Sequence, residues 1–326
     1  MDKKNQLKSL WKNSFSVTQS YTNLFFDYLY SDENVKFLER DGKIVSALYS
    51  LPYKMQAFSK PVKASYLCGV STQQEYRGQG LVSTLIKDTL ASLYNDGFEL
   101  CALIPVSESL YSFYSRFDFA PVYKYKIIKK PKTQNSTLIL KPMKNYQLCS
   151  DIHKKQLFSR GFSFELDANH FEFISKECLM FDELPLEIYD GDKFCGYIFY
   201  RDEDNIPLIR EMLLENADEQ DAINALCQLK NIEEVSLCSP CCASETEGLE
   251  NMGMMRALNA VKLLEKIYFD NQHIEICDNI IKQNNGTYIF TKNGAVKTNK
   301  KAKNVINVCD IPSMICKNPY INMLLN

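Results

Sequence analysis

The stretch that decides the fold of this chain is Val70-Ser71-Thr72-Gln73-Gln74-Glu75-Tyr76-Arg77-Gly78-Gln79-Gly80-Leu81. Apolar and polar residues alternate before it, which predicts a strand that ends near Val70. After Gly80 the apolar residues recur at helical spacing as far as Asn95-Asp96-Gly97, which predicts a helix that begins at Leu81. A glycine-bearing loop between a strand and a helix directs several backbone N–H groups at one point, and this arrangement suits a pyrophosphate. The spacing matches neither the dinucleotide fingerprint nor the Walker loop.

The segments around this loop alternate between strand and helix patterns. The turn signal Asp41-Gly42 is followed by the apolar run 44–51, which we expect to pair with the strand that ends near Val70. Residues 98–104 form a compact apolar run closed by Pro105. A short helical pattern then leads to residues 117–119. The predicted order is hairpin, strand, helix, strand, helix and strand.

The second part of the chain repeats pieces of this order. Asp190-Gly191 precedes the apolar run 194–200 as Asp41-Gly42 precedes 44–51. Pro240 is followed by Met252-Gly253-Met254 at the interval that separates Pro105 from Phe117-Asp118-Phe119. We interpret this as a degenerate internal duplication, and two unrelated units that agree by chance remain the alternative.

The duplication predicts which copy binds an anion. The segment 211–219, where the second copy would carry its loop, lacks Gly and Arg and holds four carboxylates, Glu211, Glu215, Asp218 and Glu219. Such a segment would repel a pyrophosphate. Only the first copy is therefore expected to be active.

The composition is that of an ordinary globular protein of two or three domains. The 326 residues include 45% hydrophobic and 24% charged residues, with 38 Lys and Arg against 40 Asp and Glu. A net charge of −2 gives no reason to expect nucleic acid as a partner. No apolar stretch is long enough for a membrane span, and the first residues have a helical pattern rather than that of a signal peptide.

The 12 cysteines are too sparse for a disulfide-stapled secreted scaffold. We therefore expect reduced thiols, a cytoplasmic location and no partner in the membrane. Cys238, Cys241 and Cys242 lie close together, but no second Cys pair or His follows at a suitable spacing, so we expect no metal. Cys68 and Cys101 lie on predicted core strands, where a thiol acts as a small hydrophobe.

From about Asn259 the pattern changes to one amphipathic helix followed by short strands at 274–276, 288–290 and 305–308. This indicates a small third domain. Its basic run, Lys297, Lys300, Lys301 and Lys303, is expected to be solvated surface, with anion binding as the alternative.

The loop resembles that of the GCN5-related N-acetyltransferases (GNAT), whose acetyl-CoA loop has Arg or Gln followed by Gly-x-Gly or Gly-x-Ala. Arg77, Gly80 and the preceding Val70 match that pattern, while Val82 replaces the usual small residue. The resemblance implies that the strand splays from its neighbour, so that Val70, Ser71 and Thr72 can pair with the pantetheine arm. The other cofactor contacts that it implies are Arg77, Gly78, Gln79, Gly80, Leu81, Val82, Ser83 and Ser109.

Residues 110–119 resemble the second signature of that family, a Tyr on a helix followed by an aromatic-x-aromatic strand start. The three-part arrangement and residues 253–258 resemble the enhanced intracellular survival (Eis-like) acetyltransferases. The resemblance implies an α+β fold with tandem GNAT domains, whose sheets are mixed and mostly antiparallel with flanking helices, and a small sterol carrier protein-like domain. The expected limits are 1–130 for the acetyl-CoA-binding domain, 131–256 for the degenerate copy and 257–326 for the last domain.

The same resemblance implies two catalytic groups. Tyr114 is the candidate acid that protonates the departing CoA thiolate, with a core aromatic as the alternative. The C-terminal carboxylate of Asn326 is the candidate base, with docking of the last residues without chemistry as the alternative. A normal α-carboxyl is a weak base unless it is desolvated or linked through water.

The expected function is acetyl transfer from acetyl-CoA directly to a primary amine. The alternative is a regulatory protein that binds acyl-CoA or an apolar ligand without turnover. Polyamines, aminoglycosides, lysine side chains and peptide N-termini all present amines, so a small-molecule or peptide acceptor stays unidentified, and a homo-oligomer is left open.

Overall fold

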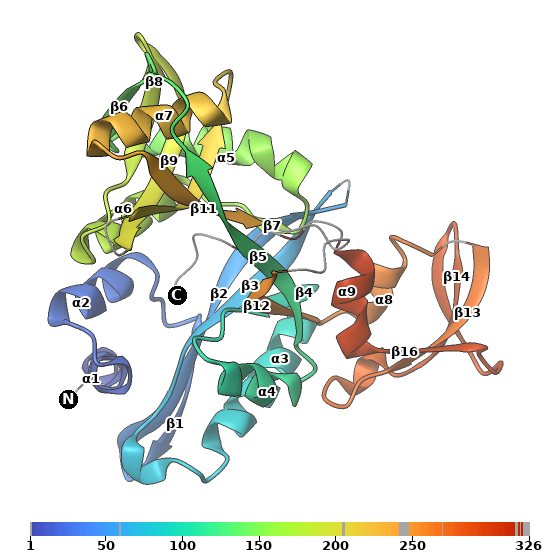
Figure 1. The fold of residues 1–326 in the computed structure, drawn as a ribbon. Helices are drawn as coiled ribbons and strands as arrows, with labels where there is room; N and C mark the ends of the chain where they lie inside the picture. Colours follow the sequence, from blue (N-terminus) through green and yellow to red (C-terminus); the bar gives the residue numbers. More distant parts are fainter. Residues whose placement is uncertain are drawn as a thin grey trace.

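The computed structural model describes residues 2–58, 60–203, 206–240, 248–268, 270–316, 319 and 321. In these residues the chain forms a 12-stranded sheet and a separate 4-stranded sheet, with helices packed against both (Figure 1). The α+β class with mixed, mostly antiparallel pairing is thus confirmed.

The first half of the large sheet is built from residues up to Pro131. Its helices are α1 (Lys3–Phe15), α2 (Gln19–Tyr28), η1 (Gln74–Tyr76), α3 (Leu81–Asn95) and α4 (Glu108–Ser115). Its strands are β1 (Val35–Arg40), β2 (Lys43–Ala57), β3 (Lys60–Thr72), β4 (Leu100–Leu103) and β5 (Ala120–Pro131). The predicted start of the helix at Leu81 is confirmed.

The second half contains a similar succession. Its helices are α5 (Tyr146–Arg160), α6 (Ala168–Met180) and α7 (Glu219–Lys230). Its strands are β6 (Ile139–Pro142), β7 (Ser163–Phe164), β8 (Leu186–Asp190), β9 (Lys193–Glu203), β10 (Ile206–Leu214), β11 (Glu234–Pro240) and β12 (Glu250–Ala257).

The strand order supports the duplication. The series β1-β2-β3-β4 at one side of the sheet corresponds to β8-β9-β10-β11 at the other. In both series the first three strands are antiparallel and the last pair is parallel. A helix connects the parallel pair in each case, α3 in the first half and α7 in the second.

The two halves exchange their last strands. The order across the centre is β4-β12-β5-β11, so β12 inserts between β4 and β5, while β5 crosses to pair with β11. Figure 1 shows β5 as the long strand that runs from one half into the other. The proposed limits 1–130 and 131–256 stay a prediction, because the sheet is continuous across them.

Helices cover both faces of the first half. Strand β2 alternates its side chains, so that Ala47 and Tyr49 pack with α1 and α2 while Leu48 packs with α3. Leu7, Leu10 and Trp11 are the buried face of α1, as their helical spacing predicts. As a result, the edge of β3 that does not pair with β4 lies between α1 on one face of the sheet and α3 and α4 on the other.

One expectation about the second half is wrong. Glu211 does not lie in a loop but inside β10, where it is buried and accepts a hydrogen bond from the hydroxyl of Tyr197 at 2.5 Å. His153 contacts the same hydroxyl at 3.3 Å. The loop before α7 is shorter than expected and comprises residues 215–218.

The third part carries the small sheet, in the order β15-β14-β13-β16. Its helices are α8 (Ala260–Leu264), η2 (Lys282–Asn284), η3 (Val308–Asp310) and α9 (Ile311–Ile315). Its strands are β13 (Asp270–Cys277), β14 (Gly286–Thr291), β15 (Gly294–Thr298) and β16 (Asn304–Asn307).

A buried arginine joins the three parts. Arg256, at the end of β12, is 0% exposed and donates to both carboxylate oxygens of Asp278 at 2.8 and 3.0 Å. It also donates to Asp118 at 3.3 Å, in the turn before β5. Asn284 donates to Asp278 and to the carbonyl oxygen of Leu258. One cation thus ties the exchanged strand to the first half and to the small sheet.

We predict that Arg256→Met lowers the free energy of unfolding by about 3–5 kcal/mol, because it leaves the buried Asp278 carboxylate without its partner. Urea unfolding followed by circular dichroism measures this change. The control is Arg201→Met, whose side chain is 47% exposed in its pair with Glu203, and it should cost about 1 kcal/mol or less. Equal effects of the two variants would contradict the assignment.

Candidate functional site

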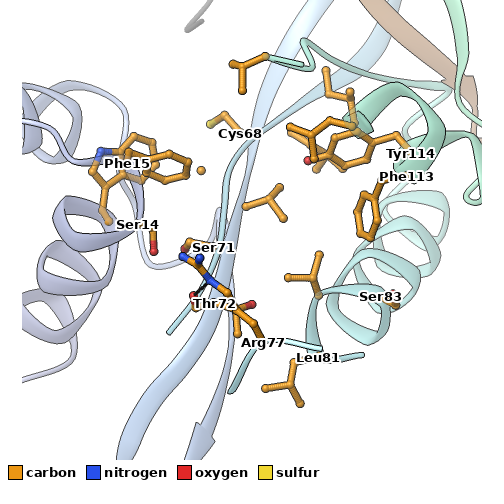
Figure 2. Close-up of a pocket in the computed structure, with 18 of the residues that line it drawn as sticks. Ser14, Phe15, Cys68, Ser71, Thr72, Arg77, Leu81, Ser83, Phe113 and Tyr114 are labelled. Atoms are coloured by element: carbon orange, nitrogen blue, oxygen red, sulfur yellow. Dashed lines mark hydrogen bonds between the residues drawn. The ribbon is translucent and has the colours of Figure 1, made fainter. Parts of the chain in front are cut away.

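A large cavity lies along the free edge of β3. Its volume is about 810 Å³. Figure 2 shows Ser14 and Phe15 on one side, Phe113 and Tyr114 on the other, and the residues of β3 between them. The cavity therefore connects the α1 face of the sheet with the face covered by α3 and α4.

The cavity exists because β3 and β4 separate. The two strands are paired only at Ala64–Leu100, Ser65–Cys101 and Tyr66–Ala102. β3 then continues to Thr72 along β2, whereas β4 ends at Leu103. The splay implied by the family resemblance is thus present, and Val70, Ser71 and Thr72 line the cavity.

A bulge at Gly69 turns the edge of β3 toward α1. The register with β2 shifts between the pairs Tyr49–Cys68 and Ala47–Ser71, and Gly69 has a φ of +58°. A Cβ at this position would lie 2.0 Å from the Trp11 ring. Only glycine satisfies both the left-handed backbone and this close approach.

The start of α3 forms the polar end of the cavity. Gly78 and Gly80 have φ values of +78° and +76°, and a Cβ on either would meet no atom within 4 Å. Gly80 is the N-cap of α3, and no side chain caps the helix there. The first N–H groups of α3 and the positive end of its dipole are therefore available to an anion.

Arg77 lies between this cavity and a second, more polar one of about 760 Å³ bounded by α1 and the turn at Asp41-Gly42. Its Nε donates to the carbonyl oxygen of Thr72 at 3.2 Å, as Figure 2 shows. This hydrogen bond holds the guanidinium beside the end of β3. The guanidinium contributes positive charge to the α3 end of the cavity.

Tyr114, on α4, lines the cavity. Its side chain is 7% exposed, and it packs edge-on against Phe113 and Phe119. Burial, with a smaller contribution from Cys68, raises the pKa of Tyr114 to about 12. The phenol therefore stays protonated at neutral pH and can act as a hydrogen donor.

Several lining residues escaped the sequence analysis. Cys68 was expected to be a core thiol, but it is half-buried and lines the cavity. Burial raises the pKa of Cys68, so the thiol is not ionised at neutral pH. Trp11, Phe15 and Tyr21 supply an aromatic wall on the opposite side from Tyr114. No local motif marks these residues, because their role depends on how α1 and α2 pack on the sheet.

Other expected site residues lie elsewhere. Gln79 is exposed and bonds to the carbonyl oxygen of Glu75, while Ser109 is exposed and bonds to Ser107, and neither lines the cavity. Asn326, Cys241 and Cys242 lie outside the described residues. Among those that are described, no cluster of His, Cys, Asp and Glu could hold a metal ion. No helix in the same residues is long and apolar enough to cross a membrane.

The N-terminal part of the chain matches a known domain family. Residues 1–122 match the family described as the acetyltransferase (GNAT) domain. The N-terminal part of the chain is therefore similar to acetyltransferase domains of this family. No curated protein sequence matches the chain significantly.

Solved structures share the fold over nearly the whole chain. A GCN5-related N-acetyltransferase from Anabaena variabilis has a TM-score of 0.77 at 19% identity, covering 95% of this chain and 86% of that one. A probable N-acyltransferase from Enterococcus faecalis has a TM-score of 0.78 at 15% identity, covering 96% and 87%. Eis1 from Mycobacterium abscessus has a TM-score of 0.75 at 11% identity, covering 96% and 86%. The predicted Eis-like arrangement of the tandem fold agrees with these similarities.

We predict that Gly69→Ala disrupts the site, because the added methyl group would collide with Trp11. Thermal unfolding should show a larger loss than for the control Gly97→Ala, which has a φ of +79° but open space around the Cβ. The control should cost about 1–2 kcal/mol from the left-handed backbone alone. Equal losses would show that the contact with Trp11 does not constrain β3.

Proposed function

We propose that the chain is an acetyl-CoA-dependent N-acetyltransferase that moves the acetyl group directly to a primary amine. The observation that carries this proposal is one continuous cavity. It runs from the uncapped start of α3, along the splayed edge of β3, past Tyr114 to the aromatic wall at Trp11. A donor and an acceptor can thus meet from opposite faces of the sheet.

The α3 end suits the pyrophosphate of the cofactor. Its oxygens would accept from the N–H groups of Leu81, Val82 and Ser83, while Gly78 and Gly80 leave room for close approach. The pantetheine arm would then lie along Val70, Ser71 and Thr72, where β3 extends beyond the end of β4 and has no paired strand on that side. Gln79 and Ser109 could contribute only if their side chains turned toward the ligand.

Direct transfer requires an uncharged amine. A primary amine with a pKa of about 10.4 is neutral in only about one molecule in 2,500 at pH 7, which corresponds to about 4.6 kcal/mol. A proton acceptor near the amine is therefore useful. On the other side, the CoA thiolate needs a proton, and the protonated Tyr114 is suited to donate it.

The remaining parts of the proposal rest on the family resemblance. They are the sterol carrier protein-like nature of residues 257–326, a cytoplasmic location and the Asn326 carboxylate as one candidate for the proton acceptor. The acceptor would be a polyamine, an aminoglycoside, a lysine side chain or a peptide N-terminus. A panel with one member of each class, assayed by release of the CoA thiol, tests the activity. Binding of acetyl-CoA without turnover of any amine would favour the non-catalytic alternative.

We predict that one acetyl-CoA binds per chain and that Gly80→Asp abolishes binding. The Asp side chain would place a negative charge at the start of α3, on a backbone that favours glycine. The second half offers no equivalent, because the carboxylate of Asp218 already caps α7 and Glu219 and Asp221 lie in its first turn. Isothermal titration calorimetry measures both quantities.

Gly191→Asp is the matched control, since it makes the same change at a positive φ of +57° in an open hairpin turn of the second half. It should bind acetyl-CoA like the wild type. Unchanged affinity of Gly80→Asp, or a stoichiometry near two, would contradict the placement of the cofactor.

We predict that Tyr114→Phe lowers kcat by about 10²-fold and leaves the Kd for acetyl-CoA nearly unchanged, because only the proton donor is lost. Tyr111→Phe is the control. Tyr111 lies on the same helix and its pKa is also raised to about 12 by burial, but it does not line the cavity. Equal turnover of both variants would show that Tyr114 acts only in packing.

A further inference from the structure

The aromatic wall of the cavity contains one residue that reaches across to the second half of the chain. Tyr21, on α2, lines the cavity and is 7% exposed. Its hydroxyl donates to Oε1 of Glu177, on α6, at 2.8 Å. The ring is held by an edge-on contact with Phe181, with centroids 5.6 Å apart. A carboxylate of the second half is thereby connected to a cavity of the first.

The direction of this hydrogen bond decides what Tyr21 can offer to a ligand. Since its only proton is directed at Glu177, the oxygen has lone pairs left to accept a hydrogen bond from another donor. An ammonium or amine N–H group is such a donor. Tyr21 therefore suits the acceptor substrate rather than the thioester carbonyl.

The surroundings of Glu177 make it a proton acceptor near neutral pH. Burial raises the pKa of the Glu177 carboxyl to about 7, while the Tyr21 hydrogen bond and the charge of Arg210 oppose this rise. Arg210 itself forms a two-pronged contact with Glu183, at 3.1 Å to each oxygen. The titratable and charged groups facing Glu177 are Tyr21 from α2, Tyr53 from β2, Tyr66 from β3, Cys178 from α6, Glu183 from the segment after α6 and Arg210 from β10.

We propose that Tyr21 and Glu177 form a proton relay that deprotonates the acceptor amine, an inference that rests on the proposed acetyl transfer. A proton of the bound ammonium group moves to the oxygen of Tyr21 as the hydroxyl proton of Tyr21 moves to Glu177. The amine lone pair then forms the N–C bond while the C–S bond breaks. The leaving sulfur takes the hydroxyl proton of Tyr114. The surplus proton on the acylated nitrogen then passes to the Tyr114 oxygen and restores its hydroxyl group.

Neither Tyr21 nor Glu177 could deprotonate the amine without the other. Burial and Glu177 raise the pKa of Tyr21 well above its usual value, so the phenol is not a base by itself. Glu177 does not line the cavity and acts only through Tyr21. Tyr21 is thus the catalytic residue, and Glu177 is a positioning and proton-storing residue behind it.

The test compares pH–rate profiles for the amine that the wild type turns over best in the panel described above. The wild type should lose kcat/KM as the pH falls through about 7, because Glu177 becomes protonated. Glu177→Gln should lack this step and lose about 10²-fold in kcat/KM at pH 7.5. Tyr21→Phe should show a similar loss, and the double variant should lose no more than either single variant.

Glu172→Gln is the matched control. It removes a carboxylate from the same helix, but one that pairs with Lys176 at 2.8 Å, and it should leave the profile unchanged. An unchanged profile in Glu177→Gln would overturn the relay. Loss of activity on amidation of the C-terminus, with Glu177→Gln fully active, would overturn it in favour of the terminal carboxylate.

A second measurement needs no acceptor. Because the pKa of Glu177 is higher in the folded than in the unfolded protein, its contribution to stability is fully present below about pH 4.5 and is lost as the pH rises to about 7. The melting temperature of Glu177→Gln relative to the wild type should therefore rise between pH 5 and pH 8. A constant difference would overturn the relay, whereas a rising difference in a protein that turns over no amine would contradict the proposed function alone.

Discussion

The exchange of β5 and β12 is the constraint on which the rest of the structure depends. Each strand is hydrogen-bonded within the half that it did not come from, so the two halves share one sheet and cannot rotate against each other. This rigidity keeps α2 beside α6, and a hydrogen bond between Tyr21 and Glu177 can therefore persist across the boundary. Arg256, at the end of the exchanged strand β12, holds the small sheet in place through its hydrogen bonds to Asp278.

The corresponding positions of the two halves differ: the first half has a cavity where the second half has a buried polar cluster. Ser65 pairs with Cys101, four residues before Pro105, and Leu208 pairs with Ser236, four residues before Pro240. Counting three residues further along each strand makes Cys68 and Glu211 equivalent. Cys68 faces a cavity, whereas Glu211 is buried beside Tyr197 and His153. A buried polar cluster thus occupies the position in the second half that borders the cavity in the first.

The features that could be predicted from the sequence are those determined by residues close together in the chain. The loop around Gly80, the limits of α3 and the repeated hairpins all follow from local turn and periodicity signals. Glu211 was misplaced because an isolated carboxylate in an apolar strand gives no sign of its buried partners. Cys68 and the aromatic wall were missed for a similar reason, since only the packing of α1 on the bulge at Gly69 shows which side of β3 is open. Glu177 lies far from Tyr21 in the chain, so no local pattern could pair them.

The exchanged strands also govern the order in which the protein can form during synthesis. When the ribosome has completed β5, its neighbour β12 does not yet exist, and the sheet of the first half has a gap between β4 and β5. Both strands then expose unpaired backbone edges until residue 257 has emerged. The sheet of the first half is therefore complete only after the second half has been translated, and until then the nascent chain carries unpaired strand edges of the kind that favour aggregation.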